Sequence, residues 1–480
     1  MAISISCRAL QIVLPKKVSF PSNVAYQTSL GSYWSAQEQD LSPSCIVAPK
    51  SSKDVSIAVV ALSLFNRVGG YVGLSSPFAV RGGGHTPWAG SANIANGVVI
   101  DLSAMKDVKV NSDQSVTSLG PGLRWVEVYS KLDSMGLAVL GGRVADVGVA
   151  GLTLGGGISF FSGQYGFVCD NVENYEVVLA SGKVVNVNTK ENHDLWLALK
   201  GGSNNFGIVT RFDVKTIKHG ESWGGNVINT IDTRFDQFRA FEGLNNATSD
   251  DDQRGALINS YAFGGGQPGF SIVNNLHYTK PEAYPALFKP FTDIQPQVYN
   301  NLRISNLSDF TRELEQPGSL RERFTTITVG NKASILEEAF NIFNSTLQTV
   351  IDAPGLVYAL SLQAIPSSIR QQSTNLGGNS LGIPPSEGPL CVILLSTGWS
   401  DITDDDRLEA AAKSWYAQLS EAARASGLDN DWIYLNYAAE FQDPIKGYGV
   451  KNKANLQAVS RKYDPSGIFQ KAVPGGFKLF

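Results

Sequence analysis

Runs of glycine are the feature that most constrains how this chain of 480 residues can fold. Forty-eight residues are glycine, and many stand in four clusters, at residues 82–84, 155–157, 201–202 and 264–266. Glycine clusters interrupt long helices and strands, and they occur where the backbone turns tightly or approaches a ligand without a Cβ in the way. The sequence therefore predicts loops that pack closely on one another or on a bound molecule.

The bulk composition argues against several classes of protein. Hydrophobic residues make up 43% of the chain and charged residues 17%, which is enough to bury a large core, and the net charge is −4. No run of Lys and Arg indicates nucleic-acid binding, and no 18-residue apolar run predicts a transmembrane helix. None of the four cysteines has metal-site spacing. Since the first residues do not resemble a signal peptide, we expect a cytoplasmic protein that binds neither nucleic acid nor membrane, with secretion as the alternative.

The pattern of predicted secondary structure changes near residue 220. Before that point short apolar strands alternate with helical stretches and Gly-rich turns, and residues 98–102, 176–180 and 208–212 are predicted to be buried strands. After it come four longer stretches that we expect to form one sheet, at residues 270–278, 324–329, 356–363 and 390–396.

Two amphipathic helices are expected among these longer strands. The first begins with the capping-box pattern Ser334-x-x-Glu337, and the second starts at about Asp406. Strands with helices segregated among them favour an α+β domain. Because the last fifty residues return to short Gly- and Pro-rich elements, we expect the tail to fold back onto the N-terminal domain.

Three glycine-containing segments could hold a cofactor. In Arg81-Gly82-Gly83-Gly84-His85-Thr86 the backbone N–H groups could converge on phosphate oxygens, although an ordinary turn with a surface histidine is the alternative. Residues 148–157 contain five glycines and suit a backbone wrapped against a flat or anionic ligand, with a structural loop as the alternative. Residues 194–210 predict a short helix, a glycine stop and a buried strand, and packing alone explains most of them.

These three segments, in this order, resemble the FAD-linked oxidoreductases of the vanillyl-alcohol-oxidase superfamily, in the berberine-bridge-enzyme-like branch. The tail agrees, because Tyr434-Leu435-Asn436-Tyr437, Gln442-Asp443-Pro444 and Lys462-Tyr463-Asp464-Pro465 match the C-terminal pattern of that branch. The amino-acid sequence of the tail is most similar to that of fungal members, many of which act in specialised-metabolite pathways. The likeness covers residues 1–215 and 430–480 closely and residues 220–430 only in general character.

The resemblance implies an α+β fold in three parts. A two-subdomain PCMH-type FAD-binding domain would span residues 1–218, and an α+β substrate domain with an antiparallel sheet would span residues 219–430. A C-terminal segment, residues 431–480, would return to the FAD-binding domain and complete it.

The resemblance also implies FAD as the cofactor, attached by one covalent bond to His85. Val144 stands where many relatives carry a second, cysteine attachment, so double attachment is not expected at this site. The cofactor-binding residues that the resemblance implies are Arg81, Gly82, Gly83, Gly84, His85, Thr86, Gly148, Gly151, Leu152, Gly156, Ile158, Ile208, Val209 and Tyr434.

Tyr437 matches the family's catalytic base, and Asn436 stands beside it, with a purely structural tyrosine as the alternative. In the implied reaction Tyr437 takes a proton from a small organic substrate while hydride passes to flavin N5. Dioxygen then reoxidises the flavin and yields hydrogen peroxide. Gln363 is the one pocket residue that we suggest in the substrate domain. A cyclase or isomerase with no net oxidation, and a flavin-binding protein without activity, are the alternatives.

Cys7 and Cys45 stand where secreted relatives pair cysteines. Because no export signal is seen before them, we expect both thiols to be reduced in the cytoplasm, where glutathione keeps most thiols in that state.

Overall fold

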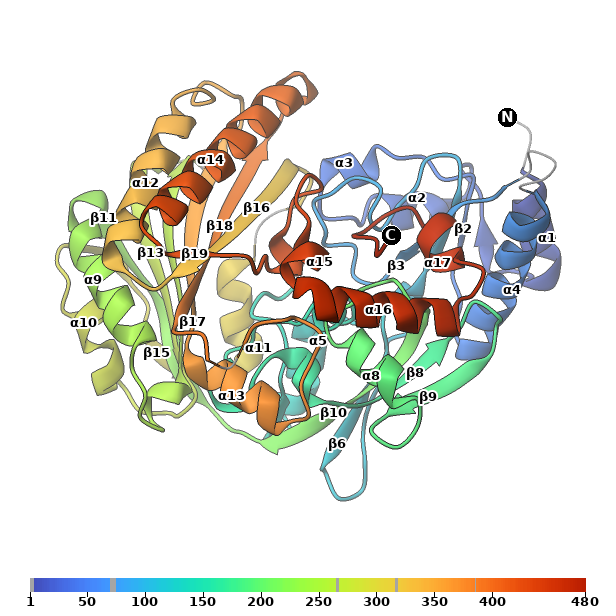
Figure 1. Cartoon of the computed structure of the whole chain (residues 1–480), viewed down its shortest axis with the longest axis horizontal. Coiled ribbons are helices and arrows are strands. Elements are labelled where there is room, and N and C mark those ends of the chain that lie inside the picture. Colours follow the sequence, from blue (N-terminus) through green and yellow to red (C-terminus); the bar gives the residue numbers. More distant parts are fainter. Residues whose placement is uncertain (1–3, 70–74, 265–266, 316–317, 385) are drawn as a thin grey trace.

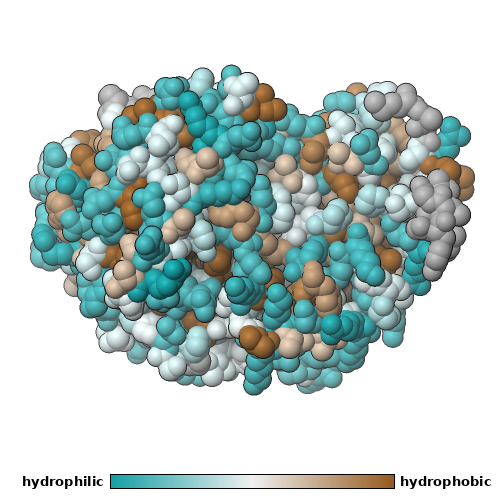
Figure 2. Space-filling model, turned by 45° about the horizontal axis from the view of Figure 1, so that its top comes forward, coloured by the Kyte–Doolittle hydropathy of each residue, from teal (hydrophilic) through white to brown (hydrophobic). Residues whose placement is uncertain are grey.

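The computed structural model describes residues 4–69, 75–264, 267–315, 318–384 and 386–480, so two residues of the glycine cluster at 264–266 lie outside it. The chain forms two lobes that lie side by side (Figure 1), and the outline of the molecule is indented between them (Figure 2). The first lobe holds two sheets from the N-terminal half and the helices of the C-terminal segment. The second lobe holds one large sheet and its helices. The predicted α+β fold is confirmed.

The first sheet of the first lobe is small and mostly parallel. Its strand order is β1-β2-β4-β3, and β4 pairs in parallel with both β2 and β3. Strand β3 leads directly into Gly82, so this sheet positions the first glycine segment. Its strands are β1 (Val18–Ser19), β2 (Cys45–Val47), β3 (Phe78–Arg81) and β4 (Val98–Asp101). The nearby helices are α1 (Ile5–Val13), α2 (Val24–Leu30), α3 (Ala36–Gln39) and α4 (Ser52–Gly69).

The second sheet of the first lobe is antiparallel, in the order β5-β6-β10-β8-β9, and β7 also pairs with β10. A tight turn at residues 181–183 joins β8 to β9, and within it the Gly182 N–H donates to the Leu179 carbonyl. Its strands are β5 (Val108–Val110), β6 (Val116–Leu119), β7 (Leu137–Val139), β8 (Val172–Val178), β9 (Val184–Asn188) and β10 (Ile208–Lys218). Its helices are α5 (Trp125–Asp133), α6 (Val149–Leu154), α7 (Ser162–Tyr165) and α8 (His193–Leu199). The buried strands predicted in this half of the chain are confirmed as β4, β8 and β10.

The second lobe is built on a nine-stranded antiparallel sheet in the order β14-β11-β13-β12-β17-β18-β16-β19, with β15 paired to β11. The four long strands predicted from the sequence are β13, β16, β17 and β18 of this sheet. Its strands are β11 (Ser222–Thr230), β12 (Gly255–Gly264), β13 (Gln267–Tyr278), β14 (Gln297–Asn300), β15 (Arg303–Ser305), β16 (Arg321–Gly330), β17 (Val357–Ile365), β18 (Leu390–Trp399) and β19 (Asp429–Asn430). The bounds of the three predicted domains stay predictions.

Helices α9, α12 and α14 cover the outer face of this large sheet (Figure 1). Both predicted helices are present, but the capping box at Ser334 is wrong: α12 begins at Ala333, and its N-cap is Lys332. The Glu242 carboxylate, from α9, accepts the Ala333 N–H at 2.7 Å and so replaces a local cap. The helices of this lobe are α9 (Arg234–Asn245), α10 (Lys289–Thr292), α11 (Leu307–Phe310), α12 (Ala333–Leu347), α13 (Ser367–Asn375) and α14 (Asp405–Ala425).

The C-terminal segment returns to the first lobe, where its helices lie across one face (Figure 1). Its apolar side chains, among them Trp432, Tyr434 and Leu456, belong to the core of that lobe. Its helices are α15 (Pro444–Gly447), α16 (Gly449–Tyr463) and α17 (Ile468–Lys471). In the described part of the chain no helix is both long enough and apolar enough to cross a membrane.

The expectation that Cys7 and Cys45 are free thiols is wrong, because a disulfide joins them. Cys7 lies on α1 and Cys45 on β2; both are buried, and their Cα atoms are 6.0 Å apart, within the reach of a disulfide. The bridge fastens the N-terminal helix to β2. The cytoplasmic location stays a prediction, and the bridge argues against it, since cytosolic thiols are mostly kept reduced.

Candidate functional site

A cavity of about 510 Å³ lies where the two lobes and the C-terminal segment meet. The glycine segments of the first lobe line it on one side and strands of the large sheet on another, and residues 434–438 of the C-terminal segment also line it. A volume of this size is typical of a site for a small molecule or cofactor. The site residues predicted from the sequence should therefore line this cavity.

The loop of residues 82–86 follows β3 and lines the cavity. Gly84 has φ +69°, a conformation that favours glycine. Within the described part of the chain, the backbone N–H groups of residues 82–86 donate to no protein acceptor. Because unpaired backbone N–H groups are rare in folded proteins unless water or a ligand accepts from them, this loop can hold an anion such as a diphosphate.

The two glycine segments meet backbone to backbone. A Cβ on Gly83 would lie 2.5 Å from the Cα of Gly148, and a Cβ on Gly148 would lie 2.6 Å from the Cα of Gly83. Neither position can therefore carry a side chain without moving a main chain. A Cβ on Gly151, which also lines the cavity, would meet no protein atom within 4 Å. The wall at Gly151 is thus open to a flat ligand.

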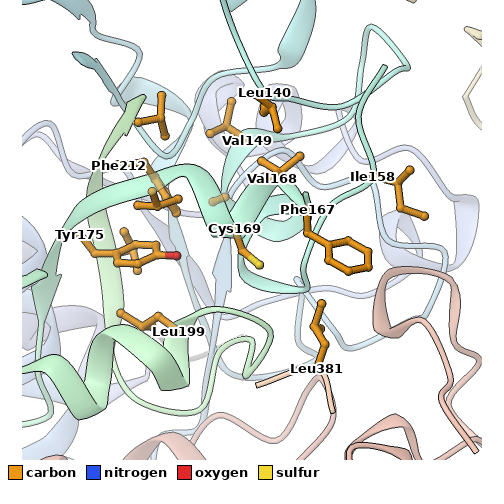
Figure 3. Close-up of a cluster of buried hydrophobic side chains, with 14 of the residues drawn as sticks. Leu140, Val149, Ile158, Phe167, Val168, Cys169, Tyr175, Leu199, Phe212 and Leu381 are labelled. Carbon is orange, nitrogen blue, oxygen red and sulfur yellow. The ribbon is translucent and has the colours of Figure 1, made fainter. Parts of the chain in front are cut away.

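Helix α6 connects this wall to the core of the first lobe. Val149 is buried in a cluster with Leu140, Val168, Tyr175 and Phe212 (Figure 3). Gly151 and Leu152, on the same short helix, line the cavity instead. The packing of one face of α6 therefore fixes the position of the other face.

His85 lines the cavity and stacks on Trp34, with ring centroids 4.4 Å apart and planes 9° apart. Burial, and to a smaller extent the nearby positive charge of Arg124, lower the pKa of the His85 imidazole to about 4. Arg124 is itself paired with Asp146 at 3.0 Å. At neutral pH His85 is therefore uncharged, and one ring nitrogen keeps its lone pair.

Two of the predicted cofactor residues lie outside the cavity. The Arg81 side chain is 2% exposed, donates to the carbonyl oxygens of Ser29 and Ser32, and lies over the Tyr33 ring. Gly156 faces Leu381 rather than the cavity. Arg81 fixes the strand that precedes the glycine loop, because its guanidinium is directed towards α2.

The other predicted residues come together around one space. Twelve of the fourteen cofactor candidates line the cavity, and so do Tyr437, Asn436 and Gln363. The twelve are Gly82, Gly83, Gly84, His85, Thr86, Gly148, Gly151, Leu152, Ile158, Ile208, Val209 and Tyr434.

Tyr437 lies at the junction of the two lobes. Its hydroxyl donates to the side-chain oxygen of Gln363, on β17, at 3.2 Å. Its ring is held edge-on by Phe324, with centroids 5.9 Å apart, and by Tyr434, with centroids 4.8 Å apart. Tyr437 is half-buried and lines the cavity, whereas Tyr434 is 1% exposed and burial raises the pKa of its phenol. Of the two tyrosines, Tyr437 is the better placed to accept a proton.

Asn436 ties the C-terminal segment to α6. Its side-chain amide donates to the Leu152 carbonyl and to the Tyr434 hydroxyl, each at 3.0 Å. A Cβ on Gly155 would lie 2.0 Å from the Asn436 side-chain oxygen, so that glycine makes room for the amide. Asn436 therefore positions the tyrosines and lies beside the cavity.

Sequence reasoning missed Arg143 and Trp34. The Arg143 side chain is 6% exposed, lines the cavity and donates to the same Gln363 oxygen as Tyr437. Arg143 stands directly before Val144, a position already singled out, but nothing in the sequence shows which way its side chain points. Trp34 is far from every glycine segment in the sequence and is brought to His85 only by the fold.

The residues present fit FAD. The free N–H groups of residues 82–86 suit its diphosphate, and the open wall at Gly151 suits its flat ring. Val144 lines the cavity and has no thiol, so His85 is left as the predicted point of attachment.

Comparison with known proteins supports this assignment. The family model described as "FAD binding domain" matches residues 43–188. The FAD-dependent monooxygenase CTB5 of Cercospora beticola is 38% identical over 487 residues, which cover 98% of this chain and 91% of that protein.

Two solved structures share the fold. The BBE-like 1 protein of Physcomitrella patens superimposes with a TM-score of 0.77 at 19% identity, over 98% of this chain and 99% of that one. A carbohydrate oxidase from Microdochium nivale gives a TM-score of 0.78 at 20% identity, over 99% and 100% of the two chains.

Proposed function

Because this chain belongs to the FAD-linked oxidoreductases of the berberine-bridge-enzyme-like branch, we propose that it oxidises a small organic molecule with FAD tethered to His85 and Tyr437 as the base. The chain is an FAD-dependent oxidoreductase. The observation that carries the finer proposal is that His85, the free N–H groups of the glycine loop and Tyr437 line one cavity. The resemblance to fungal members extends the proposal to a role in specialised-metabolite biosynthesis.

The first lobe would hold the cofactor in three ways. The N–H groups of residues 82–86 would bind the diphosphate, and the wall from Gly148 to Leu152 would support the flat ring. His85 is uncharged at neutral pH and has a nitrogen lone pair free to form the covalent bond. Trp34, stacked on the imidazole, keeps the ring in one orientation.

The chemistry that FAD supplies when bound is a two-electron oxidation, with dioxygen as the final acceptor and hydrogen peroxide as its product. The chain itself supplies the proton acceptor and the geometry. Once it has lost its own proton to solvent, Tyr437 would take the proton of a substrate hydroxyl. In the structure Gln363 accepts from the Tyr437 hydroxyl at 3.2 Å, which holds the tyrosine oxygen in place. Phe324 and Tyr434 prevent the Tyr437 ring from turning away.

Monooxygenation is a second candidate, favoured by the activity for which the Cercospora beticola relative is named. An oxidase releases one hydrogen peroxide for each substrate oxidised, whereas a monooxygenase places one oxygen atom of dioxygen in the product. Peroxide yield per product and the incorporation of ¹⁸O from ¹⁸O₂ separate the two reactions.

The test is a visible spectrum of the purified protein, followed by an anaerobic screen of alcohols and phenols. We expect a yellow protein whose flavin absorption bleaches with the right substrate and returns on admission of air. A colourless protein that takes up no FAD would contradict the proposal. A yellow protein that forms product with no flavin bleaching and no use of dioxygen would favour the cyclase or isomerase alternative.

A further inference from the structure

A second pocket, of about 260 Å³, shares no lining residue with the cavity between the lobes. It is lined by residues of α13, of the loop at 376–384 and of α16. Thr374 of α13 and Pro384 of the loop line it and are exposed, so the pocket opens to solvent. Its described lining residues include one Arg and no Asp or Glu. The proposed function makes no use of this pocket.

The loop presents unpaired backbone donors to the pocket. Within the described part of the chain, the N–H groups of Asn379, Gly382 and Ile383 donate to no protein acceptor, and all three residues line the pocket. Gly382 has φ +79°, and a Cβ there would lie 2.2 Å from the Tyr448 carbonyl oxygen, so only glycine fits. Consecutive N–H groups at such a left-handed residue form a concave site for anions.

Arg370 adds a buried positive charge to the same pocket. The residue is 2% exposed, and its guanidinium donates to the carbonyl oxygens of Ile365, Glu387 and Gly388. Its Nε is buried and has no hydrogen-bond partner in the described structure, where no carboxylate is paired with Arg370. The Glu387 carboxylate accepts from Asn430 instead. A buried charge without a counter-ion is costly, and a bound anion would relieve that cost.

Asp170 lies behind the pocket but does not cancel this charge. Its carboxylate accepts from the Ser373 hydroxyl and from the Asn379 side-chain amide, which both belong to the pocket lining. The buried amino group of Lys200 lies on the other side, 3.5 Å from the Asp170 carbonyl oxygen. Lys200 therefore offsets Asp170, and the charge of Arg370 remains.

We infer that this pocket is a second ligand site, which binds a phosphate group through Arg370 and the N–H groups of Asn379, Gly382 and Ile383. A tetrahedral oxyanion accepts from several directions at once and so suits donors on both a side chain and a loop. The ligand is inorganic phosphate or a small phosphate ester. The inference goes beyond the proposed function, because the pocket lies outside the flavin cavity.

The loop connects this site to the core of the first lobe. Leu381 belongs to the core cluster of that lobe (Figure 3), and a Cβ on Gly201 would lie 2.6 Å from the Leu381 side chain. A ligand that fastens the loop therefore binds the folded protein and not the unfolded chain, so it should raise the melting temperature.

The experiment is titration calorimetry of the flavin-containing enzyme, in which FAD occupies the loop at residues 82–86. The probes are inorganic phosphate and glycerol 3-phosphate, and sodium chloride of equal ionic strength is the reference. We expect at least one probe to bind with a Kd below about 1 mM and to raise the melting temperature, while sodium chloride does neither. The tighter probe shows whether the ligand is the free ion or an ester.

Charge changes at the mouth of the pocket locate the site. The Thr374 hydroxyl donates only within its own helix, to the Arg370 carbonyl, so the fold should tolerate its replacement. Thr374→Glu should weaken phosphate binding by about threefold or more, and Thr374→Lys should tighten it by a similar factor. Gln418→Glu and Gln418→Lys, at an exposed position of α14 outside the pocket, are the matched controls and should leave the Kd unchanged.

Arg370→Met should abolish phosphate binding, and if that protein does not fold, the two Thr374 variants decide. A Kd above about 1 mM for both probes would overturn the inference. Equal effects of the substitutions at Thr374 and at Gln418 would also overturn it, because they would place the phosphate elsewhere on the protein.

Discussion

Two walls of the cavity are built in different ways. The glycine wall of the first lobe comprises residues 82–84 and 148–151, and the small-residue shelf of the second lobe comprises Ser260, Ala262, Ala359, Ser361 and Ser396 of β12, β17 and β18. In the first lobe two segments approach until only glycine fits, so that Gly83 and Gly148 are fixed by main-chain contact. In the second lobe the shelf depends on the register of three antiparallel strands, which places Ser260 beside Ser361. A position where two main chains touch tolerates almost no substitution. A position that the strand register places at the cavity accepts any side chain of suitable size. The first wall suits a constant ligand, and the second can change with the substrate.

The largest effect is expected where the two glycine segments meet. Gly83→Val should prevent this contact, because even its Cβ would lie 2.5 Å from the Cα of Gly148. We expect little folded protein and almost no bound flavin, measured by circular dichroism and by flavin absorbance per mole of protein.

Gly243→Ala is the control for Gly83→Val. Gly243 lies in α9, and a Cβ there meets no atom within 4 Å. The unfolding free energy of the Gly243→Ala protein should equal that of the wild type or exceed it by up to about 1 kcal/mol, because alanine has a better helix propensity than glycine. A Gly83→Val protein that folds and holds FAD normally would show that the glycine wall tolerates substitution as readily as the small-residue shelf.

Tyr437 joins the two walls, since it comes from the C-terminal segment and bonds to Gln363 of the sheet. Tyr437→Phe keeps the ring contacts but removes the proton acceptor. General-base catalysis contributes about 10²–10⁴-fold, so anaerobic flavin reduction should slow by about that factor while flavin content stays the same. Stopped-flow absorbance measures the rate.

Tyr434→Phe is the matched control and should be milder, because Tyr434 is buried and its hydroxyl accepts from Asn436. A wild-type rate in Tyr437→Phe would place the base on the second lobe. Loss of FAD from Tyr437→Phe would make the tyrosine structural.

The stability of the contact between the lobes should depend on pH through the protonation of His277. This β13 residue is 1% exposed, stacks on Phe160 at 4.0 Å, and has no hydrogen-bond partner in the described structure for either ring nitrogen. Burial lowers its pKa well below the usual value, and the nearby His219 lowers it further.

Because the unfolded chain takes up this proton below about pH 6.5 and the folded protein does not, stability should fall as pH falls from that point. The slope is at most about 1.4 kcal/mol per pH unit for one group. His277→Phe should flatten the slope measured by denaturant unfolding between pH 7 and about pH 5, relative to wild type. His193→Gln, at the exposed start of α8, should leave the slope as it is in wild type. An unchanged slope in His277→Phe would contradict this assignment.

The contrast between the two walls also explains what the sequence could predict. Gly82, Gly148 and Tyr437 belong to short sequence patterns that can be recognised without knowledge of the fold. The shelf carries no such pattern, because Ser260, Ser361 and Ser396 are ordinary strand residues until the register sets them side by side. The disulfide cannot be predicted in this way either, because the sequence does not show that the fold brings Cys7 of α1 next to Cys45 of β2.

Arg81 shows the limit of local patterns within the glycine loop itself. It directly precedes Gly82, yet its side chain binds α2 and Asp101 and stays outside the cavity. The direction of one side chain within a short sequence pattern depends on the neighbours that the fold brings to it, and the sequence alone does not identify those neighbours.

In the proposed function, one covalent bond to His85 holds the FAD. The direct measurement is peptide mass mapping of protein from which free flavin has been removed by acid precipitation. We expect the precipitate to stay yellow and the mass of FAD to appear on the peptide that contains His85 and on no other. Quantitative release of the flavin by acid, or its mass on any other peptide, would contradict attachment at His85.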